Sequence, residues 1–312
     1  MSRIAVLKGG RSLERQVSLR SGARVEDALA RLGHDVVGID AGLDLIGRLR
    51  EWAPDAVFIA MHGRDGEDGT VQELLEILGL PYTGSGVLGC LRATDKVLAK
   101  HLMLEAGLPT PDFVAFSEAA FRGLGAAEAL APIEDRLGFP LVIKPSSQGS
   151  ALGIKFARSA ADVPAALVAA FSYDSRVLLE RHVDGRDLAV SVLAGEALPV
   201  VEAVPREEPF YDFEARYEIG RTEFVCPAEL PGGLDQRAQD LALRTNELLG
   251  CSGFARVDLM LGADGELTVL EANVVPGLTE TSLLPQAAEA ADIGFDELVG
   301  RMLEPALAAA PA

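Results

Sequence analysis

The first part of the chain alternates between two patterns of hydrophobic positions. Three apolar runs have the length of buried β-strands: residues 4–7, 36–40 and 56–60. Two segments carry apolar residues at helical spacing: Val25, Ala28, Leu29 and Leu32, then Val71, Leu74, Leu75 and Leu78. This alternation predicts a parallel sheet with helices packed against it. Glu14 and His62 each follow a predicted strand, at the edge where such sheets bind ligands.

The remainder of the chain predicts two further units. The first begins with a helix through Asp95, Lys96 and Leu98 that ends near Gly107. Its later elements are strands at 141–144, 154–156 and 177–180 and a helix at 160–171. The last unit has strands at 188–193 and 199–204, a hairpin at 255–273 and a helix at 295–303. We expect the alanine-rich end after Leu303 to fray. The predicted fold class is α/β, with units at 1–94, 95–184 and 185–312.

The predicted hairpin brings two carboxylates together. Asp264-Gly265 is a strong signal for a two-residue turn. With that turn, Asp258 lies opposite Glu271 and Arg256 lies opposite Asn273. Facing carboxylates repel each other unless a cation lies between them, and Mg²⁺ is commonly held by one or two carboxylates together with substrate phosphates. The hairpin therefore indicates a metal–nucleotide site; the alternative is a solvated sheet face whose charge Arg256 offsets.

Two glycine-rich segments are candidates for phosphate binding. The predicted strand that ends at Lys144 runs into a loop rich in Gly and Ser, through Gly153, whose N–H groups and hydroxyls could surround phosphate oxygens. An ordinary hairpin loop explains this segment equally well. Residues 84–89 match GxGxxG, the fingerprint of dinucleotide-binding oxidoreductases. That motif follows only a very short strand and lacks the acid expected at the end of a second strand.

Composition narrows the function classes. The chain has 312 residues, enough for two or three compact units, and a formal charge of −19 from 47 acidic and 28 basic residues. This excess of negative charge argues against nucleic-acid and anionic-membrane partners. The three cysteines (Cys90, Cys226 and Cys251) are widely separated and favour neither a zinc site nor a disulfide framework. The N-terminus predicts a strand rather than a signal peptide, so we expect a cytoplasmic protein.

Taken together, these segments resemble the ATP-grasp superfamily and, within it, the D-alanine–D-alanine ligases. The resemblance extends from Ile4 to about Leu303, and its matching stretches are 9–19, 62–69, 81–86, 95–96, 144–153, 211–217, 226–228, 271–273 and 276–279. It implies a two-part ATP-grasp fold after the N-terminal parallel domain. It also implies ATP-dependent joining of two D-alanine molecules through an acyl phosphate, for peptidoglycan precursor synthesis, by a homodimer.

The resemblance implies a role for each matching residue. ATP would be held by Lys96, Lys144, Glu180, Val183, Asp187 and Arg216. Two Mg²⁺ or Mn²⁺ ions would be held by Asp258, Glu271 and Asn273. The first D-alanine would lie at Glu14 and His62, and the second at Ser282 and Leu283. Arg256 and the Gly277 backbone would stabilise the oxyanion. Glu14, Ser150 and Tyr217 would form a hydrogen-bonded triad that ties a closing loop to the site.

Several positions depart from the family pattern. Arg216 and Asp187 stand where the family usually has Lys and Glu, and Arg is a planar fork rather than a point charge. Val274 and Val275 replace hydroxyl residues, and Ala151 replaces a common Ser. Three alternatives remain at this point: an ATP-grasp ligase with other amino-acid substrates, a dinucleotide-dependent oxidoreductase and a non-catalytic nucleotide-binding regulator.

Overall fold

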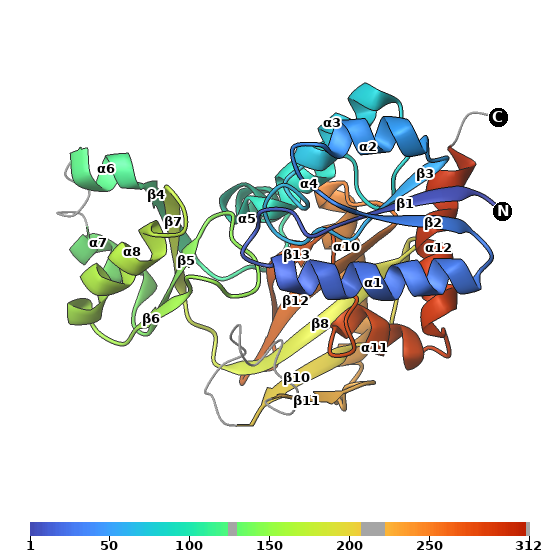
Figure 1. The fold of residues 1–312 in the computed structure, drawn as a ribbon. Helices are drawn as coiled ribbons and strands as arrows, with labels where there is room; N and C mark the ends of the chain where they lie inside the picture. The colour runs from blue at the N-terminus through green and yellow to red at the C-terminus, as the bar shows by residue number, and fades with distance from the viewer. Residues whose placement is uncertain (124–129, 207–221, 310–312) are drawn as a thin grey trace.

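The chain builds three sheets in sequence order. The computed structural model describes residues 1–123, 130–206 and 222–309. Arg216 and Tyr217 lie outside these ranges. Figure 1 shows the four-stranded second sheet and its helices as a lobe set apart, while the first and third sheets lie together with the C-terminal helices.

The first sheet is parallel, as predicted, with strand order β2-β1-β3. Its strands are β1 (Arg3–Lys8), β2 (Asp35–Asp40) and β3 (Ala56–Ile59), with helices α1 (Arg15–Arg31), α2 (Leu45–Trp52) and α3 (Thr70–Leu78). The helix α2 was not predicted, because only Leu45 and Leu49 give it a buried face. The predicted apolar face of α1 ends at Leu29, since Leu32 lies past the helix end and is 42% exposed.

Two helices lead from the first sheet into the second. These are α4 (Val87–Thr94) and α5 (Lys96–Glu105), with Asp95 as the N-cap that accepts from Val97 N–H and Leu98 N–H. The second sheet is antiparallel in the order β4-β7-β5-β6: β4 (Phe113–Ser117), β5 (Leu141–Pro145), β6 (Lys155–Ala157) and β7 (Arg176–Arg181). Its helices are α6 (Glu118–Gly123), α7 (Leu130–Leu137) and α8 (Val163–Phe171), and a 3₁₀ turn at Ala160–Asp162 begins the predicted 160–171 helix.

The third sheet is antiparallel, in the order β11-β10-β8-β12-β13, with β9 paired to β8. Its strands are β8 (Gly185–Leu193), β9 (Glu196–Ala197), β10 (Val201–Pro205), β11 (Thr222–Val225), β12 (Phe254–Gly262) and β13 (Leu267–Asn273). Helices α10 (Leu234–Leu249), α11 (Leu283–Glu289) and α12 (Phe295–Ala308) complete this part. Because α12 packs its buried Met302, Leu303 and Ala306 into a core shared with α1 and β3, the expected fraying after Leu303 is wrong up to Ala308.

The β12–β13 hairpin pairs in two registers. Its loop is one residue longer than the predicted turn, because Gly262 N–H donates to the Glu266 carbonyl at 2.9 Å. A β-bulge between Val269 and Glu271, with Leu270 as the extra residue, shifts the register by one position in the compensating direction. The predicted pairs are therefore confirmed at the far end: Arg256 opposite Asn273 and Asp258 opposite Glu271.

Packing contacts, rather than nucleotide binding, explain the glycines of the GxGxxG segment at residues 84–89. In the described chain, the residues before it contribute a single bridge between Tyr82 and Val57 rather than a full strand. Gly86 is the N-cap of α4, and a Cβ at Gly89 would lie 2.5 Å from the Gly250 carbonyl oxygen. Gly89 thus allows α4 to approach the backbone at Gly250. No helix in the described ranges has the length and apolar character needed to cross a membrane.

Candidate active site

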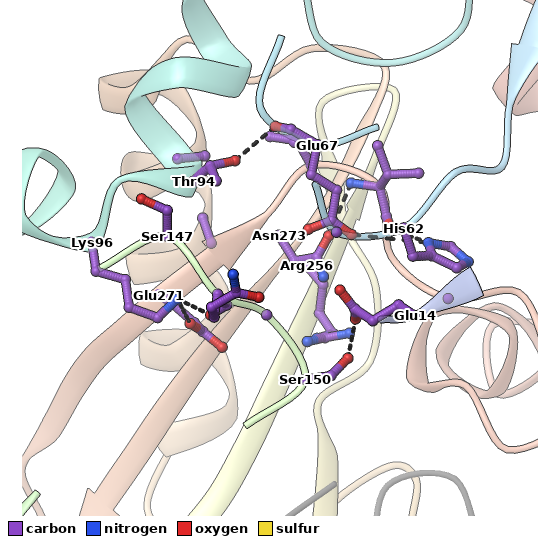
Figure 2. Close-up of a pocket in the computed structure, with 18 residues that line it drawn as sticks. Glu14, His62, Glu67, Thr94, Lys96, Ser147, Ser150, Arg256, Glu271 and Asn273 are labelled. Atoms are coloured by element: carbon purple, nitrogen blue, oxygen red, sulfur yellow. Dashed lines mark hydrogen bonds and ion pairs between the residues drawn. The ribbon is translucent and has the colours of Figure 1, made fainter. Parts of the chain in front are cut away.

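A pocket opens where loops of all three sheets meet (Figure 2). Its walls come from the loops after β1 and β3, the α4–α5 junction, the loop after β5, and the ends of β12 and β13. We call it the first pocket; its lining residues include Glu14, His62, Glu67, Lys96, Ser150, Arg256, Glu271, Asn273 and Gly277. Eight of these nine residues were predicted site residues, and Glu67 is the addition.

Glu14 and Ser150 lie in contact although 136 positions separate them. The Ser150 hydroxyl donates to Glu14 Oε1, and both residues are buried. Ser150 and Ala151 have φ values of +51° and +59°, in the left-handed region, so the loop after β5 bends sharply here. Glycine is required at position 63, because an added Cβ there would overlap Glu14 Oε2. The buried carboxylate of Glu14 therefore lies beside the bend of this loop.

His62 has protein partners on both ring nitrogens. Its Nδ1 lies 2.9 Å from the Val275 carbonyl oxygen, and its Nε2 lies 2.8 Å from Ser21 Oγ. Burial lowers the pKa of His62 to about 4, although the Val275 carbonyl opposes this shift. His62 is therefore neutral at pH 7.

Glu67 is a site residue that the sequence did not single out. It is 8% exposed, and its carboxylate lies 3.9 Å from His62 Nδ1. Burial, with the nearby charge of Glu14, raises the pKa of Glu67 to about 8. Three acids follow His62 closely in the chain, and their spacing alone does not indicate which one points into the pocket.

Asp258 and Glu271, which face each other in the hairpin, are each paired with a cation. Arg256 Nε and Nη2 donate to the two oxygens of Asp258 at 2.6 and 2.8 Å. Lys96 Nζ lies 2.9 Å from Glu271 Oε2 and also donates to the Gln148 carbonyl at 2.7 Å. The repulsion expected between facing acids is therefore compensated by one arginine and one lysine.

A second pocket adjoins the first. It is lined by Lys144, Ile154, Asp187, Leu188, Ala189, Ala203, Asp258, Leu270, Glu271 and Leu283. Glu271 lines both pockets, so the carboxylate pair lies where the two meet. Among the predicted ATP contacts, Lys144 and Asp187 line this pocket, and Val183 lies in the short connection between β7 and β8.

Glu180 contacts Lys144, which lines the second pocket, and lies between two lysines. Lys144 Nζ is 2.9 Å from its Oε1 and Lys100 Nζ is 3.1 Å from its Oε2; Glu180 is 2% exposed and Lys100 fully buried. Burial opposes the ionisation of Glu180, but the two ammonium groups outweigh it and hold the pKa of Glu180 below its usual value. Lys100 was missed, although its spacing of four from Lys96 places both lysines on one face of α5.

Backbone groups of the segment after β13 are held by side chains of Asn273 and His62. Val275 N–H donates to Asn273 Oδ1 at 2.9 Å, and the Val275 carbonyl faces His62. Valine in place of a hydroxyl residue therefore leaves these backbone contacts in place. Ser282 is the N-cap residue of α11, and its hydroxyl accepts from Thr279 N–H at 3.0 Å, close to Gly277.

The donor set suits a hard divalent cation. Asp258, Glu271 and Asn273 offer carboxylate and amide oxygens, the ligand types that Mg²⁺ prefers. Over the ranges that the structure describes, no three His, Cys, Asp or Glu side chains group together as a metal site. A cation here would therefore rely on two carboxylates, the amide of Asn273 and oxygens supplied by a bound nucleotide.

Comparison with known proteins gives a consistent picture. Residues 102–304 match a family model described as D-ala D-ala ligase C-terminus, and residues 44–85 match its N-terminus counterpart. D-alanine–D-alanine ligase of Moorella thermoacetica is 44% identical over 308 residues, covering 98% of this chain and 99% of its own. The Synechococcus sp. enzyme of the same name is 46% identical over 307 residues, covering 97% and 93%.

Solved structures agree with these matches. The D-alanine–D-alanine ligase of Bacillus anthracis complexed with ATP has a TM-score of 0.84 and 34% identity, with 99% of this chain and 98% of that chain covered. The ligase of Coxiella burnetii has a TM-score of 0.80 and 25% identity, with 99% and 96% covered.

Proposed function

Since the chain belongs to the D-alanine–D-alanine ligase family, we propose that it uses ATP to join two D-alanine molecules for peptidoglycan precursor synthesis, through the residues of the two pockets. The observation that carries the proposed site is the position of Glu271. This carboxylate lines both the first pocket, which holds Glu14 and Ser150, and the second pocket, which holds Lys144 and Asp187. Amino-acid substrate and nucleotide would thus meet at the hairpin.

In the first step, the carboxylate of one D-alanine attacks the γ-phosphate of ATP, forming an acyl phosphate and releasing ADP. Glu14 holds the ammonium group of this substrate, and Lys96 and Lys144 supply positive charge to the phosphates. Asp258, Glu271 and Asn273 would hold Mg²⁺, which supplies charge neutralisation to the phosphate oxygens when bound. Lys96 and Arg256, which now pair with these acids, would exchange partners as the nucleotide enters.

In the second step, the amine of the other D-alanine attacks the acyl carbonyl carbon, and phosphate leaves. Arg256 and the Gly277 backbone stabilise the oxyanion, an effect worth about 3–4 kcal/mol for one donor in other enzymes. Ser282 and Leu283 receive the second carboxylate. The loop around Ser150 excludes water, which would otherwise hydrolyse the acyl phosphate.

The remaining features of the proposal rest on the family. The three sheets support a division into units 1–94, 95–184 and 185–312, with α12 returning to pack on the first. Arg216 and Tyr217, outside the described residues, are assigned to the γ-phosphate and to the triad with Glu14 and Ser150. A homodimeric, cytoplasmic enzyme is the form we infer.

Product analysis tests the substrate assignment. The protein is incubated with MgATP and D-alanine, L-alanine or D-lactate, alone or with D-alanine and D-lactate together at equal concentration. Phosphate release is followed, and products are separated by chromatography. We expect D-alanyl-D-alanine as the main product at neutral pH, with D-lactate a poor acceptor and L-alanine inert. Predominant depsipeptide, or no dipeptide from D-alanine alone, would contradict the assignment.

A further inference from the structure

Two buried side chains surround the backbone turn that contains Gly277. Ser21 lies on α1, His62 lies after β3, and the turn runs from Val275 to Leu278. His62 Nδ1 contacts the carbonyl at the start of the turn (2.9 Å), and Ser21 Oγ contacts the Leu278 N–H at its end (3.1 Å). Ser21 and His62 contact each other at 2.8 Å. The turn is thus enclosed by a ring of three hydrogen bonds.

The direction of every bond in this ring is determined by chemistry. The Leu278 N–H can only donate, so Ser21 Oγ accepts from it; the Val275 carbonyl can only accept, so His62 Nδ1 must carry a proton. A neutral imidazole has one N–H, which leaves Nε2 as an acceptor for the Ser21 hydroxyl. Each of the three hydrogen bonds then has one donor and one acceptor. The neutral state, from which the direction of the Ser21–His62 bond follows, is given by burial of the ring, which lowers the pKa of His62.

We propose that Ser21 and His62 form a clamp, which holds the Val275–Leu278 turn so that the Gly277 backbone is aligned with the reacting carbonyl. Both are positioning residues in this scheme, because they act through the turn; the inference rests on the proposed function. His62 is 3% exposed and Ser21 is fully buried. With both its nitrogens engaged by protein atoms, His62 contributes to substrate binding through the backbone it holds rather than by its own contact.

The clamp predicts a specific effect of removing one hydroxyl. Ser21→Ala deprives the Leu278 N–H of its acceptor and His62 Nε2 of its donor, so the turn shifts and the imidazole loses its fixed tautomer. Displacing a catalytic group by about 1 Å costs up to about 100-fold in rate, so kcat should fall about 10- to 100-fold. The KM for ATP should stay within about twofold, because the nucleotide site lies elsewhere. Ser21→Cys, with a weak donor and acceptor, should recover part of the rate.

Ser18 provides a matched control on the same helix. It is also fully buried, and it bridges Gly9 N–H (2.8 Å) and the Ala60 carbonyl (2.7 Å), so Ser18→Ala likewise removes two buried hydrogen bonds. Neither of these two hydrogen bonds involves His62. Both variants should lose thermal stability, but only Ser21→Ala should alter the His62 ring.

The tautomer can be measured directly by NMR on ¹⁵N-histidine-labelled full-length protein, since the chain has four histidines. His62 is assigned from the spectrum of His62→Gln. We expect a neutral Nδ1–H ring at pH 7 in the wild type and in Ser18→Ala, and an altered ring with reduced kcat in Ser21→Ala. An Nε2–H or charged wild-type ring, an unchanged ring in Ser21→Ala, or an altered ring with normal kcat would each overturn the clamp. An inactive wild type with the Nδ1–H ring would instead overturn the proposed function.

Discussion

The buried Lys100–Glu180–Lys144 cluster predicts an asymmetry between two substitutions. Glu180→Gln leaves two buried lysines without a counter-charge, whereas Lys100→Met leaves Glu180 paired with Lys144. Removing one partner of a buried ion pair costs about 3–5 kcal/mol, so Glu180→Gln should lower the free energy of unfolding by at least that amount. Lys100→Met forfeits the charged hydrogen bonds to Glu180 and Thr110, each worth about 1.5–3 kcal/mol, but it also removes a buried charge whose desolvation opposes folding.

Thermal unfolding with and without ATP measures the difference. At roughly 2–4 °C per kcal/mol, Glu180→Gln should lower Tm by at least about 6 °C, and more than Lys100→Met does. It should also raise the KM for ATP, because Glu180 positions Lys144 beside the second pocket. Glu118→Gln, which breaks the exposed pair with Arg122, is the control and should change neither quantity measurably.

The pH dependence of stability gives an independent check. Because the pKa of Glu180 is lowered in the folded protein, its contribution is complete above its ordinary value of 4.5 and is lost as the pH falls through the folded value. Equal destabilisation by Lys100→Met and Glu180→Gln would show that the three charges do not act as a shared set.

Further predictions concern the first pocket. Because the pKa of Glu67 is raised from 4.5 to about 8, wild-type stability should fall as the pH rises from 4.5 to 8, and Glu67→Gln should flatten that slope in urea titrations. Gly63→Ala should raise the KM for the first D-alanine about tenfold or more through its clash with Glu14, whereas Gly195→Ala, equally strained but facing open space, should leave it unchanged. Glu271→Gln should lower kcat at least about 100-fold while the protein stays folded. Full activity of this variant at ordinary Mg²⁺ concentration would contradict the assignment of Glu271 as a metal ligand.

Much of the fold could be predicted because its elements carry strong local periodicity. The strands of the first sheet are continuous apolar runs, and α1 and α3 show helical spacing that survives in the structure. α2 escaped prediction because only two of its residues are buried, and β4 because it pairs with β7, which lies much later in the chain. The hairpin register at Asp258 was predicted correctly for an incomplete reason, since a longer loop and a bulge displaced the pairing in opposite directions.

The residues of the candidate site divide in the same way, into those that the local sequence indicates and those that it does not. Residues in a glycine-rich or charged motif could be selected from the sequence, as Lys144 and Ser150 were. Ser21, Glu67 and Lys100 could not, because their roles depend on burial and on partners up to 257 positions away. A serine in a helix or a lysine four residues after another has many ordinary explanations, and only the packed structure shows which contacts it makes.

The bulge at Leu270 also determines how this hairpin can be redesigned. Deleting one residue from the 263–265 loop moves only the exposed tip, because the pairing from Leu261 towards the bulge can re-form around a shorter turn. Deleting Leu270 removes the offset itself. Val269 and Glu271 would then be neighbours opposite the consecutive residues Leu259 and Asp258, so the pairs would be kept in a regular ladder and the bend that the bulge gives the strand would be lost. For loop grafting or the construction of chimaeras, loop length can vary, while Leu270 is kept because it lines the second pocket and bends the strand beside Glu271.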